Sequence, residues 1–153
     1  MDSLFLEEAK TMLRRKGYRL TGPRLAILDY MIREKGHPDV QDIFEGIRSE
    51  CPGIGVATIY RTVDLLVKAG LMRALVFKGN QVRYELNRPD DHHHHLVCKA
   101  CGEIEEFASC NFKAISKEIA DITCFRIEEH TLEVYGHCSN CLFDGRAYST
   151  ENM

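Results

Sequence analysis

The sequence predicts an α+β protein made of two small domains, and three observations lead to this prediction. The first 70 residues carry apolar side chains at helical spacing, and two short runs of strand-forming residues follow them. Residues 87–91 are polar and include a proline, as a linker does. Beyond them the pattern changes to short strands, one helix and paired cysteines. We therefore expect a helical domain with a hairpin at residues 1–86, a hinge linker at 87–91 and an α/β domain at 92–153.

Four helices are expected in the N-terminal domain, because apolar residues recur there at intervals of three and four. Gly17, Gly36 and Gly70 end three of these helices, and Asp39 is the expected N-cap of the third. The side chains expected to face the core are Phe5, Ala9, Met12 and Leu13, then Leu25, Leu28 and Ile32, then Val40, Ile43, Phe44 and Ile47, and finally Ile59, Val63, Leu66 and Val67.

A β-hairpin is expected to follow the fourth helix. Leu71–Phe77 and Gln81–Leu86 are rich in strand formers and flank Gly79-Asn80, a dipeptide typical of two-residue turns. Short helices followed by a hairpin are the order of a winged helix-turn-helix, a fold that places one helix in a DNA groove.

The C-terminal domain reads as a mixture of strands and one helix. Leu96–Ala108 has the pattern of two strands around Cys101-Gly102, and Phe112–Ile122 has the pattern of a helix. Arg126–Tyr135 alternates between polar and apolar residues, which predicts a further strand.

Charge is divided unevenly between the two halves. Residues 1–88 contain 15 Lys and Arg against 11 Asp and Glu, whereas residues 89–153 contain 5 against 12. A basic half on an acidic half suggests a domain that binds a polyanion, with chance surface charge as the alternative. No run approaches the roughly eighteen apolar residues of a membrane span, and the first ten residues lack a signal pattern. We expect a cytoplasmic protein without a membrane partner.

Four of the seven cysteines form two C-x-x-C pairs, Cys98/Cys101 and Cys138/Cys141. Two intervening residues let both sulfurs of a pair reach one tetrahedral metal on a tight turn. Two such pairs predict a closed zinc site with Zn–S distances of about 2.3 Å, whose role is structural because no position stays open for a substrate. Redox disulfides are the alternative. The remaining thiols are expected to pack in the core or to be inert: Cys51, Cys110 and Cys124.

The run His92–His95 adjoins the first of these pairs. In an extended segment alternate side chains face opposite ways, so His93 and His95 share one face while His92 and His94 share the other. One strand can thus serve two metal sites. Histidines with carboxylates suit divalent iron, manganese or zinc, and five or six such ligands suit iron or manganese better than zinc. The residues that can complete these sites are His37, Glu85, Glu106 and His130.

The fourth helix has a second face of small and polar side chains. Small and hydroxyl side chains with an arginine near a helix N-terminus suit entry into a major groove, and an ordinary solvated face is the alternative. The residues of this face are Ala57, Thr58, Arg61 and Lys68, with Tyr60 on its flank.

Two other classes of function compete with DNA binding. A catalytic metal site fits the His/Glu cluster, but the sequence has no nucleophile elbow, phosphate loop or H-E-x-x-H motif. We therefore expect neither an enzyme nor a small-molecule substrate. A zinc-knuckle interaction module leaves the helices of residues 1–70 and the histidine run unexplained. Binding to operator DNA with and without metal separates the three.

Five motifs together resemble those of the ferric uptake regulator (Fur) family, and the resemblance covers roughly residues 9–141. In chain order they are Arg19-Leu20-Thr21-x-Pro23-Arg24, Ala57-Thr58-Ile59-Tyr60-Arg61-Thr62, His93-x-His95-Leu96-Val97-Cys98, Cys98-x-x-Cys101-Gly102 and Tyr135-Gly136-His137-Cys138. The resemblance implies a homodimeric transcriptional repressor, with two winged-helix domains on a dimerised α/β domain. Metal at an inter-domain hinge is expected to favour binding to palindromic double-stranded operator DNA.

The resemblance also implies two metal sites. The four paired cysteines match the structural Zn²⁺ site. A metal bridging two domains binds fully only in the closed geometry, so it shifts the population toward that geometry. Its expected occupant is Fe²⁺, for which Mn²⁺ or Zn²⁺ can substitute. The ligands implied for this regulatory site are His37, Glu85, His93, His95 and Glu106.

DNA contacts are implied in the same way. Tyr60 and Arg61 match family positions that meet the major groove, and Arg19 matches a basic residue that can reach the minor groove. Arg24 is expected to contact a phosphate, which adds affinity without sequence specificity. Thr58, from the same helix face, completes the expected set.

The sequence departs from the family pattern at a possible third metal site. Many relatives use two alternating positions of the histidine run, a glutamate and a later histidine, and here these are His92, His94, Lys113 and His130. Three histidines remain, but a lysine stands where the glutamate is expected. The peroxide-sensing branch typically has aspartate at the position of Glu106, so this glutamate favours iron-uptake regulation. A peroxide-sensing or a zinc- or manganese-responsive member of the family is the alternative.

Overall fold

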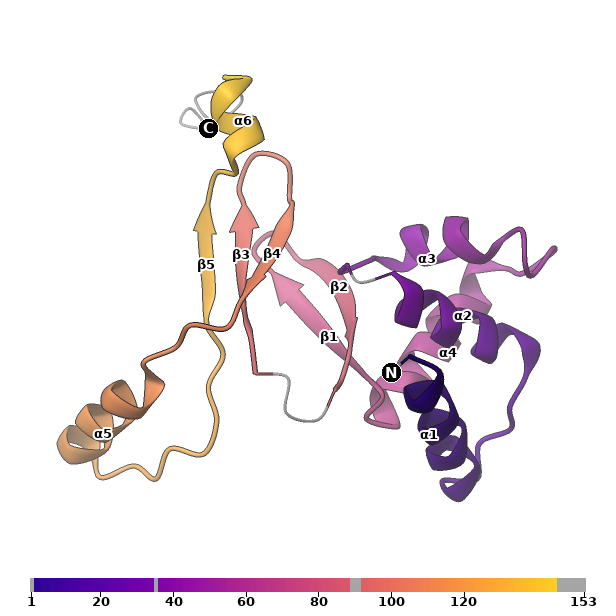
Figure 1. Ribbon diagram of the computed structural model, residues 1–153, viewed down its shortest axis with the longest axis horizontal. Coiled ribbons are helices and arrows are strands. Elements are labelled where there is room, and N and C mark those ends of the chain that lie inside the picture. Colours follow the sequence, from indigo (N-terminus) through magenta and orange to yellow (C-terminus); the bar gives the residue numbers. More distant parts are fainter. Residues whose placement is uncertain (1, 35, 89–91, 146–153) are drawn as a thin grey trace. The chain divides into compact units, whose positions relative to one another are not determined.

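A computed structural model describes residues 2–34, 36–88 and 92–145 (Figure 1). The chain divides into two compact units, Met1–Asp90 and Asp91–Met153, called here the first and the second unit. The linker expected at residues 87–91 falls at this division, and its residues 89–91 lie outside the described residues. Within the described ranges no helix is both long enough and apolar enough to cross a bilayer.

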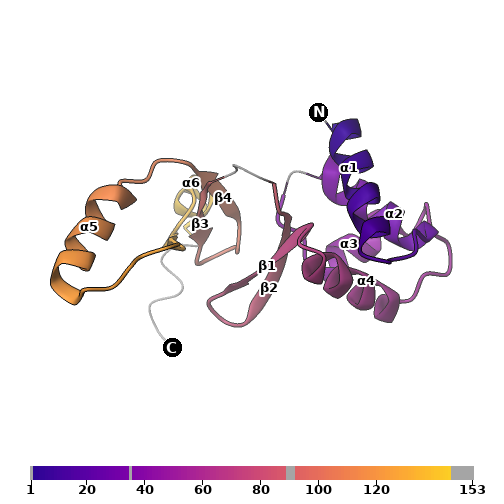
Figure 2. The same ribbon diagram turned by 90° about the horizontal axis from the view of Figure 1, so that it is seen from below.

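The first unit has the predicted order of four helices and a hairpin. Its helices are α1 (Asp2–Arg15), α2 (Gly22–Arg33), α3 (Val40–Ile47) and α4 (Val56–Lys68), and its strands are β1 (Met72–Phe77) and β2 (Gln81–Leu86). Figure 2 shows the helices gathered together and the hairpin leading away from α4. One buried core holds this unit together, and its side chains include Ala9, Leu13, Leu28, Ile43 and Ile59.

The predicted core is correct for most positions and wrong at Met12. That side chain is 38% exposed, because α1 packs through Ala9 and Leu13 and leaves Met12 on its flank. Leu25 and Val67 are only half-buried, whereas Ile27 is fully buried.

The third helix begins where the sequence predicts. The Asp42 backbone N–H donates to Asp39 Oδ1 at 2.9 Å, and the Asp39 N–H donates to Asp42 Oδ2 at 2.9 Å, which satisfies two otherwise free N–H groups. Asp42 Oδ2 also accepts from Arg83 of β2 at 2.8 Å. The hairpin is thereby fastened to α3.

The hairpin turn is one residue longer than predicted. Phe77 pairs with Gln81, so Lys78, Gly79 and Asn80 form a three-residue connection. Gly79 and Asn80 have φ values of 88° and 60°, a left-handed conformation that these two residue types tolerate.

The second unit is built on a three-stranded sheet of order β4-β3-β5. β3 (His94–Cys98) pairs antiparallel with β4 (Ile104–Phe107) and parallel with β5 (Glu133–Gly136). Between β4 and β5 lies α5 (Phe112–Thr123), which Figure 1 shows set apart from the sheet, and α6 (Ser139–Phe143) follows β5.

Two expectations for the second unit differ from its structure. The strand predicted at Arg126–Tyr135 is confined to Glu133–Gly136, because β3 offers partners only from His95 to Cys98. The short helix α6 was not predicted, since its five residues are too few to show a helical pattern.

Candidate metal centres

The topology of the second unit brings the four paired cysteines together. Cys98 ends β3, Cys101 lies in the turn to β4, and Cys138 and Cys141 lie just before and within α6. Because β5 runs parallel to β3 and Gly136 pairs with Cys98, both C-x-x-C pairs meet at one end of the sheet. The four sulfurs lie within 4.8 Å of one another.

These thiols suit a zinc ion in both geometry and charge. The Sγ atoms of Cys101 and Cys138 are 3.7 Å apart, which matches the edge of about 3.8 Å expected for a tetrahedron with Zn–S distances of about 2.3 Å. Burial raises the pKa of the Cys98 thiol, but the backbone N–H groups of Cys138, Cys101 and Ala100 outweigh it and lower this pKa to about 6. The Cys138 N–H lies 3.3 Å from Cys98 Sγ. Cys98 therefore favours the thiolate form that zinc binds. The backbone N–H of Cys141 lowers the pKa of the Cys138 thiol, but burial and the Glu103 side chain outweigh it, and this pKa is raised.

The first unit contains a buried histidine–carboxylate pair. His37 Nε2 lies 3.2 Å from Glu85 Oε2, and both side chains are about 5% exposed. Glu85 Oε1 also lies 2.8 Å from Arg73, its cross-strand partner in the hairpin. The segment that carries His37 is tied to β2, since the Tyr84 N–H donates to the carbonyl oxygen of Pro38 at 3.0 Å.

The second unit contains the other three residues expected in the regulatory site. His93 and His95 lie on one face, with ring centroids 5.0 Å apart, as the alternation predicts. His95 is opposite Glu106 in the sheet, and Glu106 Oε1 lies 4.0 Å from His93 Nε2. The five expected ligands thus form two groups of nitrogen and oxygen donors, one in each unit.

The opposite face of the same segment carries a third cluster. His92 and His94 have ring centroids 4.8 Å apart, and His130 lies 4.8 Å from the first and 5.0 Å from the second. The fourth member is Cys110, whose Sγ lies 3.2 Å from His130 Nε2. Lys113, at the position of the expected glutamate, is not a member. Burial, followed by repulsion from the neighbouring His92 and His130, lowers the pKa of His94.

Sequence reasoning missed Cys110. Cys110 was expected to pack in the core or to be inert. It does not pack in the core, because the residue is exposed and its thiol adjoins His130. Cys124 is also exposed, and Cys51 is half-buried. An isolated cysteine carries no spacing signal, and only the fold brings Cys110 beside three histidines.

The side chains of α4 that are predicted to contact DNA lie away from the core of the first unit. Ile59 is buried, whereas Tyr60 is 53% exposed and Arg61 is exposed on the same turn. Arg61 Nη2 donates to Thr58 Oγ1 at 3.3 Å, so the two side chains lie together near the helix N-terminus. A cation and a hydroxyl there can contact base edges or phosphates.

The two other predicted DNA contacts are adjacent to each other. Arg19 is exposed between α1 and α2, and Arg24 is half-buried in the first turns of α2. The Arg24 guanidinium donates to the backbone carbonyl of Arg19. This bond fixes the segment that carries the Arg19 side chain.

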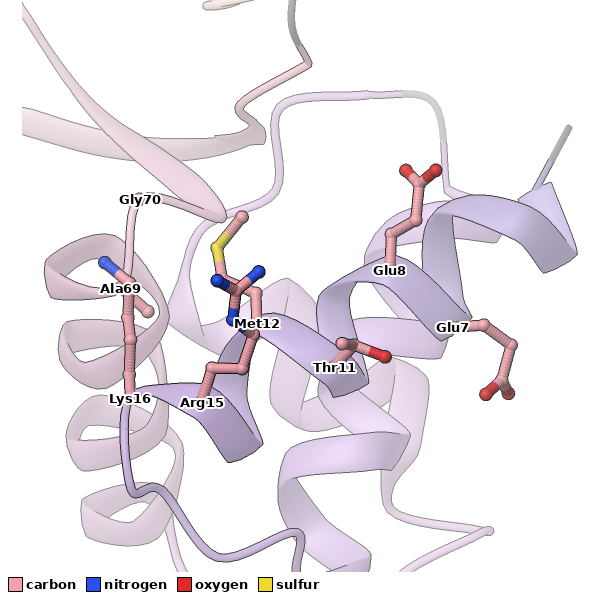
Figure 3. A pocket seen from close by; sticks show the side chains of 8 residues that line it. All are labelled: Glu7, Glu8, Thr11, Met12, Arg15, Lys16, Ala69 and Gly70. Atoms are coloured by element: carbon pink, nitrogen blue, oxygen red, sulfur yellow. The ribbon is translucent and has the colours of Figure 1, made fainter.

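A pocket of about 850 Å³ between α1 and the end of α4 does not have the character of a metal or catalytic site. Figure 3 shows the side chains of Glu7 and Glu8 pointing away from each other, and Glu7 is paired with Lys10 at 2.7 Å. Among the described lining residues, these two carboxylates thus do not converge on one point. The lining residues are Glu7, Glu8, Thr11, Met12, Arg15, Lys16, Ala69 and Gly70.

Comparison with known proteins agrees with this arrangement. Residues 15–135 match the model of the ferric uptake regulator family. The chain is 38% identical to the ferric uptake regulation protein of Neisseria meningitidis, over 88% of this chain and 93% of that protein. It is 32% identical to the peroxide operon regulator of Bacillus subtilis, over 89% and 92%. The solved structure of the Francisella tularensis ferric uptake regulator with iron superposes with a TM-score of 0.76 at 31% identity, covering 82% of this chain and 96% of that one. The chain therefore belongs to the ferric uptake regulator family of metal-dependent transcriptional repressors.

Proposed function

We propose that this protein represses iron-uptake genes as a homodimer, binding operator DNA when Fe²⁺ occupies one site between the two units. The ligands of that site are His37, Glu85, His93, His95 and Glu106. The observation that carries the proposal is the division of these donors into two incomplete groups, one in each unit. A site completed from both sides of a linker couples metal occupancy to domain orientation.

The donor set supports iron as the metal. Three imidazoles and two carboxylates are borderline-to-hard ligands, which Fe²⁺ and Mn²⁺ accept at five or six coordinates. The similarity to the N. meningitidis ferric uptake regulation protein supports the same choice. Mn²⁺ or Zn²⁺ can substitute. A coupling free energy of about 1–3 kcal/mol is enough to raise operator affinity about 5–150-fold.

The other parts of the protein have supporting roles in this proposal. The four-cysteine site holds structural Zn²⁺ and catalyses nothing, because a closed tetrahedral site leaves no position for a substrate. A second copy of the chain covers the exposed apolar side chains of α5, Ile115, Ile119 and Ile122. The N-terminal half of α4 reads base edges, Arg19 reaches the minor groove, and Arg24 contacts a phosphate. We place the protein in the cytoplasm, where iron and operator DNA are both present.

The experiment that tests this function measures operator binding by fluorescence anisotropy without oxygen, with and without Fe²⁺. His93→Ala should abolish metal-stimulated binding while leaving the structural zinc and the dimer intact. Glu106→Ala should weaken the stimulation of operator binding by Fe²⁺. Glu105→Ala, at the preceding residue of β4, should leave this stimulation unchanged. A His93→Ala protein that still responds to iron would move sensing to the cluster of His92, His94 and His130.

Peroxide sensing is the second candidate, and the similarity to the B. subtilis peroxide operon regulator favours it. Glu106 argues against peroxide sensing, because the peroxide-sensing branch of the family typically has aspartate at this position. Stoichiometric peroxide added to the Fe²⁺ protein should leave His37 and His93 unmodified, as measured by mass spectrometry. Rapid oxidation of either histidine would make this protein a peroxide sensor.

A further inference from the structure

The third cluster of the second unit includes a thiol that the ligand set implied by the family resemblance does not contain. Donor atoms of His92, His94, Cys110 and His130 all lie within 4.8 Å of one another. We propose that these four side chains form a separate zinc site, in which the Cys110 thiolate takes the place of the missing carboxylate.

Sheet topology explains why three separate segments meet here. His94 begins β3 and pairs with Phe107, the last residue of β4, and His95 pairs with Glu133, the first residue of β5. The connection that leaves β4 and the connection that enters β5 therefore lie at the same end of the sheet, on either side of the start of β3. Cys110 lies on the first of these connections and His130 on the second.

The local packing orients the donors toward a common point. Cys110 Sγ and His130 Nε2 are 3.2 Å apart, and the ring of His130 stacks on Phe112 at a centroid distance of 3.5 Å and an interplanar angle of 13°. With Zn–N of about 2.0 Å and Zn–S of about 2.3 Å, donors of a tetrahedral site lie about 3.5 Å apart. A cluster that spans at most 4.8 Å reaches this geometry through small side-chain rotations.

A buried polar atom gives independent support. The His94 side chain is almost fully buried, and its Nε2 atom has no hydrogen-bond partner in the described part of the chain. Buried polar atoms without partners are rare in folded proteins and call for an explanation such as an ion. A zinc ion bound by this cluster satisfies the free lone pair of His94.

The donor set distinguishes this site from the regulatory site. Three imidazoles and a thiolate are typical zinc ligands, whereas iron and manganese sites are richer in carboxylates, and this cluster contains none. Four protein ligands also close the coordination sphere. Because no residue of α5 is buried, a metal held by the segments flanking that helix fastens it to the sheet.

Zinc content of the full-length protein tests the proposal. The wild type, saturated with Zn²⁺ and desalted, should hold one zinc per chain more than Cys110→Ala. Cys124→Ala is the matched control, since this exposed thiol lies in the same unit and outside the cluster, and it should keep the wild-type content.

Co²⁺ added in place of zinc reports on the ligand directly. Wild type and Cys124→Ala should show a near-ultraviolet thiolate-to-cobalt absorption band that Cys110→Ala lacks. Cobalt that enters the four-cysteine site contributes equally to all three proteins and cancels in the difference. His130→Asn keeps the thiol and removes an imidazole, so it should lose the same zinc ion even if Cys110→Ala does not fold.

Failure of this proposal can be told from failure of the proposed regulatory site. His37→Ala should lose the iron response and keep the Cys110-dependent cobalt band, because His37 belongs to the other unit. Equal zinc content and equal absorption in wild type and Cys110→Ala would overturn the proposal and reduce the Cys110–His130 contact to a hydrogen bond. If the cobalt band depends on Cys110 but Fe²⁺ does not change DNA binding, only the proposed regulatory site is overturned.

Discussion

Asp42 connects two parts of the first unit through a single carboxylate. Its oxygen accepts from the Asp39 N–H at the start of α3 and from Arg83 of the hairpin. Its own N–H donates to Asp39. Asp42 therefore helps to hold α3 against the hairpin, together with the hydrogen bond from the Tyr84 N–H to Pro38.

Asp42→Ala should lower the free energy of unfolding by about 1–2 kcal/mol. About 1 kcal/mol comes from the lost half of the capping box, and the partly exposed ion pair with Arg83 adds about 0–1 kcal/mol. Urea unfolding followed by circular dichroism measures the change. Gln41→Ala, at the neighbouring exposed residue of α3, should stay within about 0.5 kcal/mol of wild type. Equal stability of the two variants would contradict the bridging role of Asp42.

Arg61→Ala should reduce discrimination between operator and altered-base DNA. A bidentate contact to a base edge contributes about 1–3 kcal/mol, so the affinity ratio should fall about 5–150-fold. Arg61 is exposed and lies beside Thr58 near the N-terminus of α4. Lys68→Ala, on the same face at the other end of the helix, is the control. Loss of a phosphate contact there would weaken binding to all sequences and leave the ratio unchanged. If Arg61→Ala weakens all DNA sequences equally, Arg61 contacts phosphate instead.

At the scale of elements, the spacing of residues along the sequence predicted those features that form within a single segment of the chain. The four helices, the hairpin strands and the two faces of the histidine run follow from local spacing, and the structure has each of them. The parallel pairing of β5 with β3 could not be predicted, because it depends on contacts between residues far apart in the sequence. Cys110 could not be found for the same reason, because it becomes a candidate ligand only when the two connections flanking α5 meet at one end of the sheet.

Helix α5 forms although none of its residues is buried within the described part of the chain. Its apolar residues Ile115, Ile119 and Ile122 recur at helical spacing, yet each is exposed by 39% or more. Ile119→Glu should therefore raise the dimer dissociation constant about tenfold or more without unfolding the protomer, since tenfold corresponds to about 1.4 kcal/mol. Sedimentation at decreasing protein concentration measures this constant. Lys117→Glu, two residues away and thus on a different face of the helix, should not change it. A dimer unaffected by Ile119→Glu would place the dimer interface elsewhere.

At the scale of the whole molecule, the two units differ in what holds them together. The first has a continuous core of buried aliphatic side chains. In the described part of the second unit only three hydrophobic residues are buried, Val97, Cys98 and Cys141, and two of these are expected zinc ligands. We therefore expect a unit with so small a core to depend for its stability on the proposed zinc site and on the proposed partner copy.

Loss of the structural zinc should therefore unfold one unit and spare the other. Zinc binding to such sites contributes about 10–16 kcal/mol of apparent free energy in small domains, far more than the second unit can gain from its few buried side chains. Cys98→Ser, or prolonged chelation of the wild type, should abolish the dimer and the secondary structure of residues 92–145. The helices of residues 2–68 should keep their circular dichroism signal and a cooperative thermal transition, because their core contains no metal ligand. Cys124→Ser serves as the control and should retain both zinc and dimer. A Cys98→Ser protein that stays dimeric with full zinc content would show that this thiolate does not hold the metal.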